Sequence, residues 1–286
     1  ALVESNSLYL GNDPSGTTST AEYNVAVGTT ALDAVTTGDK NVAVGYNALT
    51  ALNTGGKSTA VGWKSGESVT DGGLTALGAE SGLDMTTAAW VTAVGQQAGY
   101  SLTTGNGNAF FGTSAGAYCT TGTYNTNIGR DSGRDQNTGS YNTTLGDTAG
   151  LGVSGNAYSY NTLLGADAGK VLTTGSNNTH IGYQAGVATT TGDNQIIIGY
   201  QAAASAVGVD NEITLGDANI DTVRFPQDGT AFEFGVNGEV TLTHVHNTGM
   251  LLNTTMVMQF RDSAINIGSP AMMVLVEQTE KLLPQD

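Results

Sequence analysis

A glycine returns at nearly constant spacing through most of this chain of 286 residues. Ten of the twelve intervals between successive repeat glycines are 17 residues, one is 16 and one is 19. A short, fixed period that continues for more than 200 residues is typical of a solenoid, in which each repeat forms one coil. The repeat glycines are Gly11, Gly28, Gly45, Gly62, Gly78, Gly95, Gly112, Gly129, Gly146, Gly165, Gly182, Gly199 and Gly216.

The residues around each glycine predict short strands separated by tight turns. The residue before the glycine is always apolar, as in Val44 and Ile181, and the segment upstream of it alternates as a β-strand does. A second, mainly apolar column includes Leu52, Cys119 and Val153, and a Thr-Thr-Gly or Asn-Thr-Gly turn closes most coils. We therefore predict an all-β fold, a parallel β-roll or β-solenoid of about thirteen 17-residue coils. Each coil is expected to have two short strands and a thin core of small side chains, and the rod to be roughly 60 Å long.

Breaks in the period predict the domain organisation. Residues 1–22 form an N-terminal cap or attachment segment with a degenerate first coil, and residues 23–225 form the repeats. Residues 226–270 alternate and break as hairpins or a β-prism do, and residues 271–286 form a tail. The 19-residue interval is expected to bulge at 152–159 as a surface loop. No run of 18 apolar residues predicts a membrane span, and the first ten residues do not resemble a signal peptide.

Charge and cysteine content exclude several classes of protein. Nine basic against 25 acidic residues give a formal charge of −16, which argues against binding to nucleic acid or to anionic membranes. The charge suits a soluble particle in a cation-rich medium, and plain solubility explains it equally well. The single cysteine excludes an intrachain disulfide framework, and Cys119 is expected to be a structural thiol in the inward apolar column.

A column of alanines predicts self-association. The residue two before the glycine is Ala26, Ala43, Ala60, Ala76 or Ala93 in five successive coils, on the strand face opposite the valine and leucine column. A flat alanine face suits the close approach of a second copy. We expect a homo-oligomer through this face and, since three copies around an axis are common in thin β fibres, a homotrimer.

Catalytic chemistry is not expected. The sequence has no P-loop, nucleophile elbow or HExxH motif, and it lacks the GGxGxD repeat of calcium-binding β-rolls. Four aspartates on adjacent coils have a spacing that a pair of glycosidase carboxylates could use, but Asp at such positions is also an ordinary turn residue. These are Asp131, Asp135, Asp147 and Asp167. We predict that the protein is not an enzyme and has no organic cofactor.

The aromatic columns allow two interpretations, and the asparagine column allows one. Tyr124, Tyr141 and Tyr160 precede the repeat asparagine, with Tyr23 and Trp90 in the same column. A second aromatic column follows the glycine at Tyr46, Trp63, Tyr183 and Tyr200. Either the rings stack and hold neighbouring coils together, or the tyrosines form a glycan-binding stripe. The asparagines are expected to form an amide ladder that bonds turn backbone groups.

Two histidines offer a candidate metal site. His244 and His246 lie on one face of a predicted strand, because side chains repeat every second residue. In a trimer, three such pairs would supply six nitrogens for iron or another transition metal. The alternative is two ordinary surface histidines beside a turn.

The repeat resembles a known family of fibrous proteins. Segments such as NVAVGYNAL and VTAVGQQAG resemble the head repeat of trimeric autotransporter adhesins, which are parallel β-rolls that associate as trimers. Longer-period versions resemble the shafts of tail fibres of marine phages, in which the repeats precede a non-repetitive region similar to THVHNTGMLLN and QFRDSAINIGSP. The resemblance covers roughly residues 23–270 and implies an extracellular or virion-surface protein with a cell-surface glycan or receptor as partner.

Three functional classes remain open at this point. The first is a non-enzymatic fibre shaft, tail-fibre-like, that positions a receptor-binding end. The second is an extracellular adhesin or self-polymerising filament. The third, an ice-binding solenoid, needs a Thr-x-Thr face on a strand, and the threonines of the closing turns do not provide one.

Overall fold

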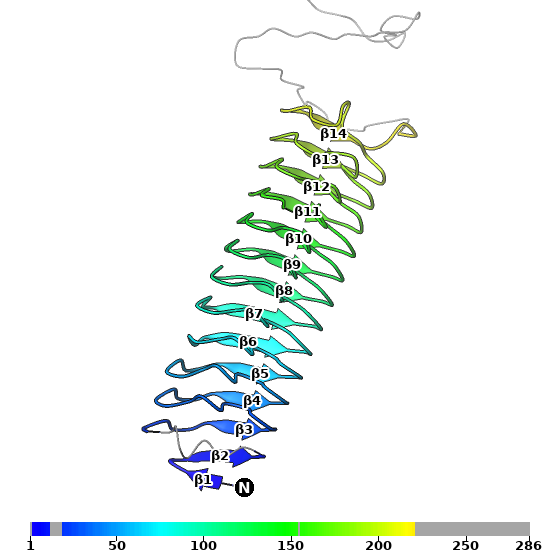
Figure 1. Cartoon of the computed structure of the whole chain (residues 1–286). Coiled ribbons are helices and arrows are strands. Elements are labelled where there is room, and N and C mark those ends of the chain that lie inside the picture. The colour runs from blue at the N-terminus through cyan, green and yellow to red at the C-terminus, as the bar shows by residue number, and fades with distance from the viewer. Residues whose placement is uncertain (1, 12–18, 154, 221–286) are drawn as a thin grey trace, which may run out of the picture. The chain divides into compact units, whose positions relative to one another are not determined.

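The computed structural model describes residues 2–11, 19–153 and 155–220, which form an all-β solenoid (Figure 1). The chain divides into two compact units, Ala1–Val223 and Arg224–Asp286, and the description concerns the first. The regions predicted at 226–270 and 271–286 lie outside the described residues.

One sheet runs the length of the solenoid. Thirteen strands, β2 to β14, lie parallel and in sequence order, and β1 pairs antiparallel with β2 at one end. Each residue pairs with its equivalent one coil later, as Val42 does with Thr59. The strands are β1 (Leu2–Glu4), β2 (Ser7–Leu10), β3 (Val25–Val27), β4 (Val42–Val44), β5 (Thr59–Val61), β6 (Leu74–Leu77), β7 (Val91–Val94), β8 (Ala109–Phe111), β9 (Thr126–Ile128), β10 (Thr143–Leu145), β11 (Thr162–Leu164), β12 (Thr179–Ile181), β13 (Ile196–Ile198) and β14 (Ile213–Leu215). The predicted fold class is confirmed.

Each described coil contains one strand, so the prediction of two strands per coil is wrong. The wall opposite the sheet consists of turns, because left-handed residues interrupt it. In the coil of Gly45 these are Asn47 (φ 56°) and Leu49 (φ 51°), and an extended strand cannot contain them. The turns still stack on one another, since Leu49 N–H donates to the carbonyl oxygen of Ser65 one coil later at 3.1 Å.

The repeat glycine allows the coils to stack closely. Gly28 to Gly199 have φ values between 129° and 143°, which L-residues rarely adopt. A Cβ on Gly129 would lie 2.7 Å from the carbonyl carbon of Gly146 in the next coil. Both the conformation and the neighbouring backbone therefore require glycine in this column.

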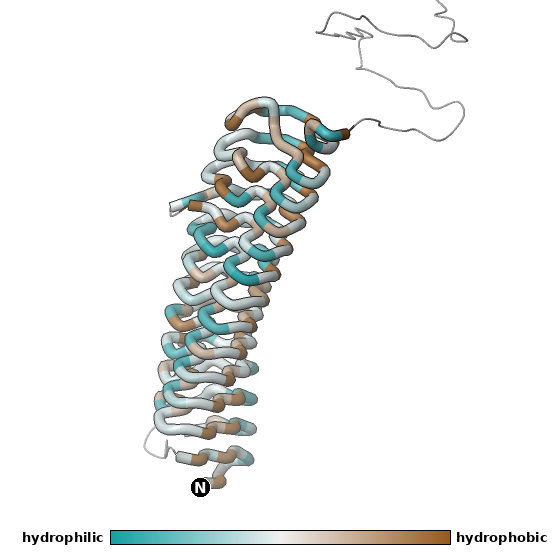
Figure 2. Tube along the Cα trace, turned by 90° about the vertical axis from the view of Figure 1, so that its right-hand side faces the viewer, coloured by the Kyte–Doolittle hydropathy of each residue, from teal (hydrophilic) through white to brown (hydrophobic). Residues whose placement is uncertain are grey.

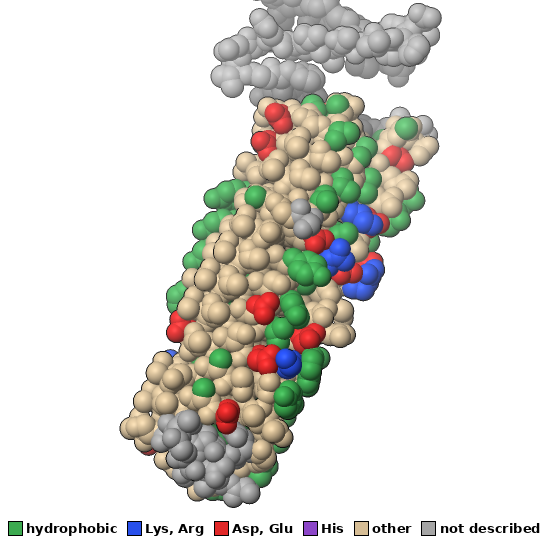
Figure 3. Space-filling view, viewed as in Figure 1, with side chains coloured by type: hydrophobic (Ala, Val, Ile, Leu, Met, Phe, Trp, Pro, Cys, Tyr) green, Lys and Arg blue, Asp and Glu red, His purple; other side chains and the backbone are tan. Residues whose placement is uncertain are grey.

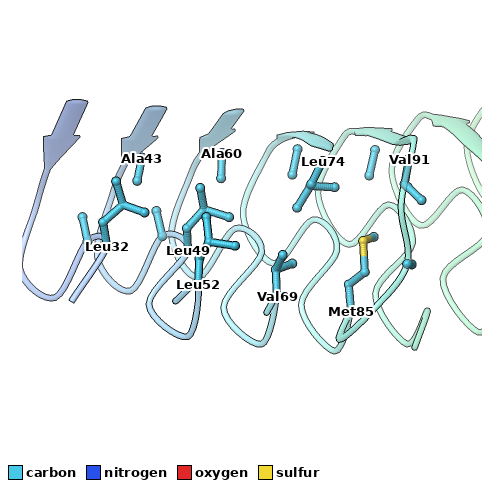
Figure 4. Close-up of a cluster of buried hydrophobic side chains, with 14 of the residues drawn as sticks. Leu32, Ala43, Leu49, Leu52, Ala60, Val69, Leu74, Met85 and Val91 are labelled. Atoms are coloured by element: carbon cyan, nitrogen blue, oxygen red, sulfur yellow. The ribbon is translucent and has the colours of Figure 1, made fainter. Parts of the chain in front are cut away.

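The alanine column forms the core, so its predicted place on an exposed face is wrong. Ala43 and Ala60 are 0% exposed, and Figure 4 shows them pointing from their strands toward Leu32, Leu49 and the interior. The coil is narrow, and a small residue on the strand leaves room for a leucine from the opposite wall. The residue before the glycine points outward instead.

Along the core, the larger side chain comes from the strand in some coils and from the opposite wall in others. Phe110 and His180 occupy the alanine column in later coils, and both are fully buried. Glycine then stands on the opposite wall: a Cβ at Gly116 would lie 2.7 Å from a ring carbon of Phe110, and one at Gly186 would overlap the His180 ring. The glycines four residues after the repeat glycine therefore make room for these larger side chains.

The 19-residue interval contributes to the core, which corrects two expectations. Val153 is 50% exposed and does not occupy the inward column. Tyr158 is fully buried there, and its hydroxyl donates to the carbonyl oxygen of Gly150. The bulge predicted at 152–159 is therefore only partly a surface loop, because it folds an aromatic ring inward.

Side-chain ladders fix the register of the coils. The predicted asparagine ladder is confirmed: Asn24 Nδ2 donates to Gly38 O at 2.8 Å, and Asn24 Oδ1 accepts from Asn41 N–H at 2.9 Å. The same bonds recur at Asn125, whose amide donates to Gly139 O and whose Oδ1 accepts from the backbone of the next asparagine. Figure 2 shows hydrophobic and hydrophilic positions recurring from coil to coil.

Candidate functional site

The outer face of the sheet is a continuous uncharged surface. It consists of the residue three before and the residue one before each repeat glycine, which we call the two outer columns. All 26 positions of these columns are Val, Leu, Ile, Phe, Ala or Thr, in a chain with a formal charge of −16. The column before the glycine is close to 40% exposed in most coils, for example 38% at Val61 and 39% at Phe111.

An edge column borders the outer face on each side. The entry edge is the residue five before the glycine, just before the strand, and includes Tyr23, Trp90, Tyr124, Tyr141 and Tyr160. The exit edge is the residue after the glycine, and includes Tyr46, Trp63, Tyr183 and Tyr200. Of the 25 large hydrophobic residues that are exposed in the described part of the chain, all but Val3, Tyr118, Val153, Val207 and Ile220 belong to the outer or edge columns. Apolar exposure is therefore concentrated on one side of the solenoid.

The tyrosines of the entry edge stack on one another, as the first interpretation predicts. Ring centroids are 5.2 Å apart between Tyr124 and Tyr141 and 5.1 Å apart between Tyr141 and Tyr160. Tyr124 also lies against Gly107, where an added Cβ would be 2.7 Å from its ring. Neighbouring rings thus occupy both faces of Tyr141, and its edge and hydroxyl group remain for a ligand. The glycan stripe stays a prediction.

The four aspartates considered as catalytic carboxylates are held in ion pairs. Arg130 bridges Asp131 and Asp147 at 2.6 and 2.7 Å, across two coils. Arg134 pairs with Asp135 at 3.0 Å and with Asp131 at 3.3 Å, and Lys170 pairs with Asp167 at 2.8 Å. The hydrogen bond from Lys170 is the largest cause of the lowered pKa of Asp167. An acid catalyst needs a proton near neutral pH, and the pair with Lys170 favours the ionised form of Asp167.

The thiol of Cys119 and the imidazole of His180 are titratable groups within the core. Burial raises the pKa of the Cys119 thiol to about 12, which suits the predicted structural thiol in the inward column. Burial lowers the pKa of His180 to about 4, and only its Nε2 has a partner, Gln195 Oε1 at 3.2 Å. Sequence reasoning missed His180, although its place in the alanine column indicates that it points inward.

The predicted metal ligands His244 and His246 lie outside the described residues. Within residues 2–11, 19–153 and 155–220, no three His, Cys, Asp or Glu side chains gather in a way that could hold a metal ion. The same part of the chain contains no helix long and apolar enough to cross a membrane. Iron or another transition metal at the two histidines stays a prediction.

Comparison of the chain with protein-family models, with curated proteins and with solved structures found no match. The resemblance to trimeric adhesin heads and phage tail-fibre shafts therefore stays a prediction. Any proposed function of the chain therefore rests on the geometry of the coils and their surfaces.

Proposed function

We propose that this chain is a structural, non-enzymatic fibre protein whose solenoid is a rigid shaft. The observation that carries the proposal is the repetition of one set of contacts over thirteen parallel strands. Backbone bonds, the asparagine ladder and the stacked tyrosines all join equivalent residues of adjacent coils. Such a solenoid grows in one dimension, by roughly 4.8 Å per coil.

The surface supports a shaft better than a catalytic domain. The carboxylates that could have served catalysis are in ion pairs, and the reactive side chains Cys119 and His180 are sealed in the core. A shaft positions what lies at its end, and the proposed place of action is outside the cell, as part of a tail-fibre-like assembly on a virion. The partner at that end would be a cell-surface glycan or receptor.

A self-polymerising adhesive filament is the second candidate, and the exposed edge tyrosines favour it. The described end of the sheet at β1 argues against growth by simple continuation. β1 runs antiparallel to β2, so a β14 strand from another copy could not extend the parallel register there.

Electron microscopy of the purified full chain separates the two candidates. We expect discrete rods with a straight section of roughly 60 Å, the length of thirteen strands at about 4.8 Å spacing. Filaments that lengthen with protein concentration would contradict the shaft and support the second candidate.

A further inference from the structure

In three coils of the solenoid, one edge column carries an aromatic residue and the other edge column carries a cation. Nine coils carry an aromatic residue on one edge, and no coil carries one on both edges. Arg130 on the exit edge accompanies Tyr124 on the entry edge of the same coil, and Lys57 on the entry edge accompanies Trp63 on the exit edge. The order in which the aromatic residue falls on the entry edge or the exit edge is irregular along the rod. An aromatic edge is therefore certain to meet a non-aromatic edge only within the same coil.

We propose that the outer face of the sheet docks a second copy of this chain, parallel and in register, about an axis along the rod. Rotation about such an axis brings the entry edge of one copy against the exit edge of the other at the same coil. The proposal replaces the alanine face with the outer face as the contact, and it holds whether or not the rod is a shaft.

The distribution of charge on the solenoid favours a second copy of the chain as the molecule that docks on the outer face. The two outer columns carry no charge, and most of the acidic and basic side chains in Figure 3 stand on the face turned to the viewer and along its right-hand edge, with a few on the left-hand edge. Rows of hydrophobic side chains run along both long edges in the same view. A strongly acidic chain repels its own copies unless they meet on a face without charge.

The outer face is large enough for a stable interface only if the two edge columns belong to the contact. The outer columns alone span roughly 7 Å by 58 Å, or about 400 Å² per copy, by strand spacing. With both edge columns the strip is roughly 15 Å wide and covers about 900 Å². A standard stable interface buries about 800 Å² per partner, so the aromatic edges are needed.

In-register pairing brings three of the edge aromatics against a cation of the partner. The ammonium of Lys40 would meet the partner's Tyr46, that of Lys57 the partner's Trp63, and the guanidinium of Arg130 the partner's Tyr124. Cations over aromatic rings attract, and do so more strongly when water is excluded. Exposed hydrophobic strips of several hundred Å² are also uncommon on monomers.

Cross-linking tests the orientation and the register. Chains with Tyr160→Cys and tagged chains with Ala166→Cys are co-expressed and treated with a short bismaleimide. Cys119 is fully buried and does not compete. We expect a cross-linked heterodimer, because residues 160 and 166 are the two edges of one coil. The register control replaces Tyr160→Cys by Tyr23→Cys, eight coils away, and should give no product.

Sedimentation of outward-facing variants tests the face itself. Leu145→Glu with Leu164→Glu places charge in the column before the glycine and should reduce the mass to that of a monomer. The control, Thr121→Glu with Thr138→Glu, puts the same charge on exposed turn residues and should stay associated. A monomeric unmodified protein, a product in the Tyr23 control, or an associated Leu145→Glu, Leu164→Glu variant would each overturn the proposal. Cross-linking of the unmodified interface remains decisive if the charged variant fails to fold.

Discussion

At the scale of single residues, the repeat glycine is determined by the backbone of the next coil as well as by its own φ. We expect Gly129→Val to destabilise the fold by at least about 1–3 kcal/mol, the usual cost of a strained backbone position. Gly155→Val is the matched control, because Gly155 also has a positive φ (92°) but nothing lies within 4 Å of an added Cβ. Thermal unfolding of both variants should show the larger loss at Gly129. Equal losses would mean that the stacked backbone contributes nothing.

A second residue-scale prediction concerns pH. The folded-state pKa of His180 is about 4 against 6.5 in the unfolded chain, so below pH 6.5 the unfolded state binds more protons. Stability is unaffected above pH 6.5 and falls as the pH drops toward 4. At pH 4.5 the loss from this group should be about 2.5 kcal/mol. His180→Leu introduces the residue that Leu163 provides in the same column, and it should lack this loss in denaturant titrations at pH 7 and 4.5. An identical pH dependence in the variant would contradict a buried neutral imidazole.

At the scale of elements, the asparagine ladder predicts which amides matter. Asn125→Ala removes a donor to Gly139 O and an acceptor of the Asn142 N–H, both in the buried interior. Each unsatisfied buried group costs about 1–3 kcal/mol, so we expect a loss of roughly 2–5 kcal/mol. Asn194→Ala removes an exposed amide bond to Asn211 and should change stability by less than about 0.5 kcal/mol. Urea unfolding measures both, and comparable losses would count against the ladder.

The strands and turns also show which parts of the fold could be predicted from the sequence. The period placed one strand of every coil correctly, because glycine, asparagine and the apolar column recur at fixed distances. It could not tell the inner face of a strand such as Val42–Val44 from the outer one, since valine and alanine are both apolar. The turn wall was misread as a second strand, although the column of Leu49 is glycine in eight other coils, a residue typical of the left-handed φ found there. Tyr158 was missed because the longer interval shifts it into the core.

The candidate surface was predicted in its parts and missed as a whole. Both aromatic columns could be recognised from their spacing, and the stacking of Tyr141 on its neighbours followed from it. Whether the two aromatic columns border an exposed face depends on which face of the strand is buried. The width of the coil decides which face that is. Once Ala43 is known to lie inside, the uncharged columns and both aromatic edges belong to one surface.

At the scale of the whole molecule, the solenoid should tolerate the loss of one complete coil, because each coil contacts only its neighbours. Deletion of residues 46–62 joins Gly45 to Trp63, so that β4 would stack directly on β6, alanine over alanine. The Leu74 N–H, which donates to Ser58 Oγ at 3.3 Å, would then donate to Asn41 Oδ1, as in the other coils. We expect a folded rod shorter by about 4.8 Å, measured by small-angle scattering. Deletion of residues 46–53 removes about half a coil, so the remainder cannot complete a turn and the ladder contacts between β4 and β5 cannot form. That variant should lose the cooperative unfolding transition, whereas equal behaviour of the two deletions would contradict a fold stabilised by coil-to-coil register.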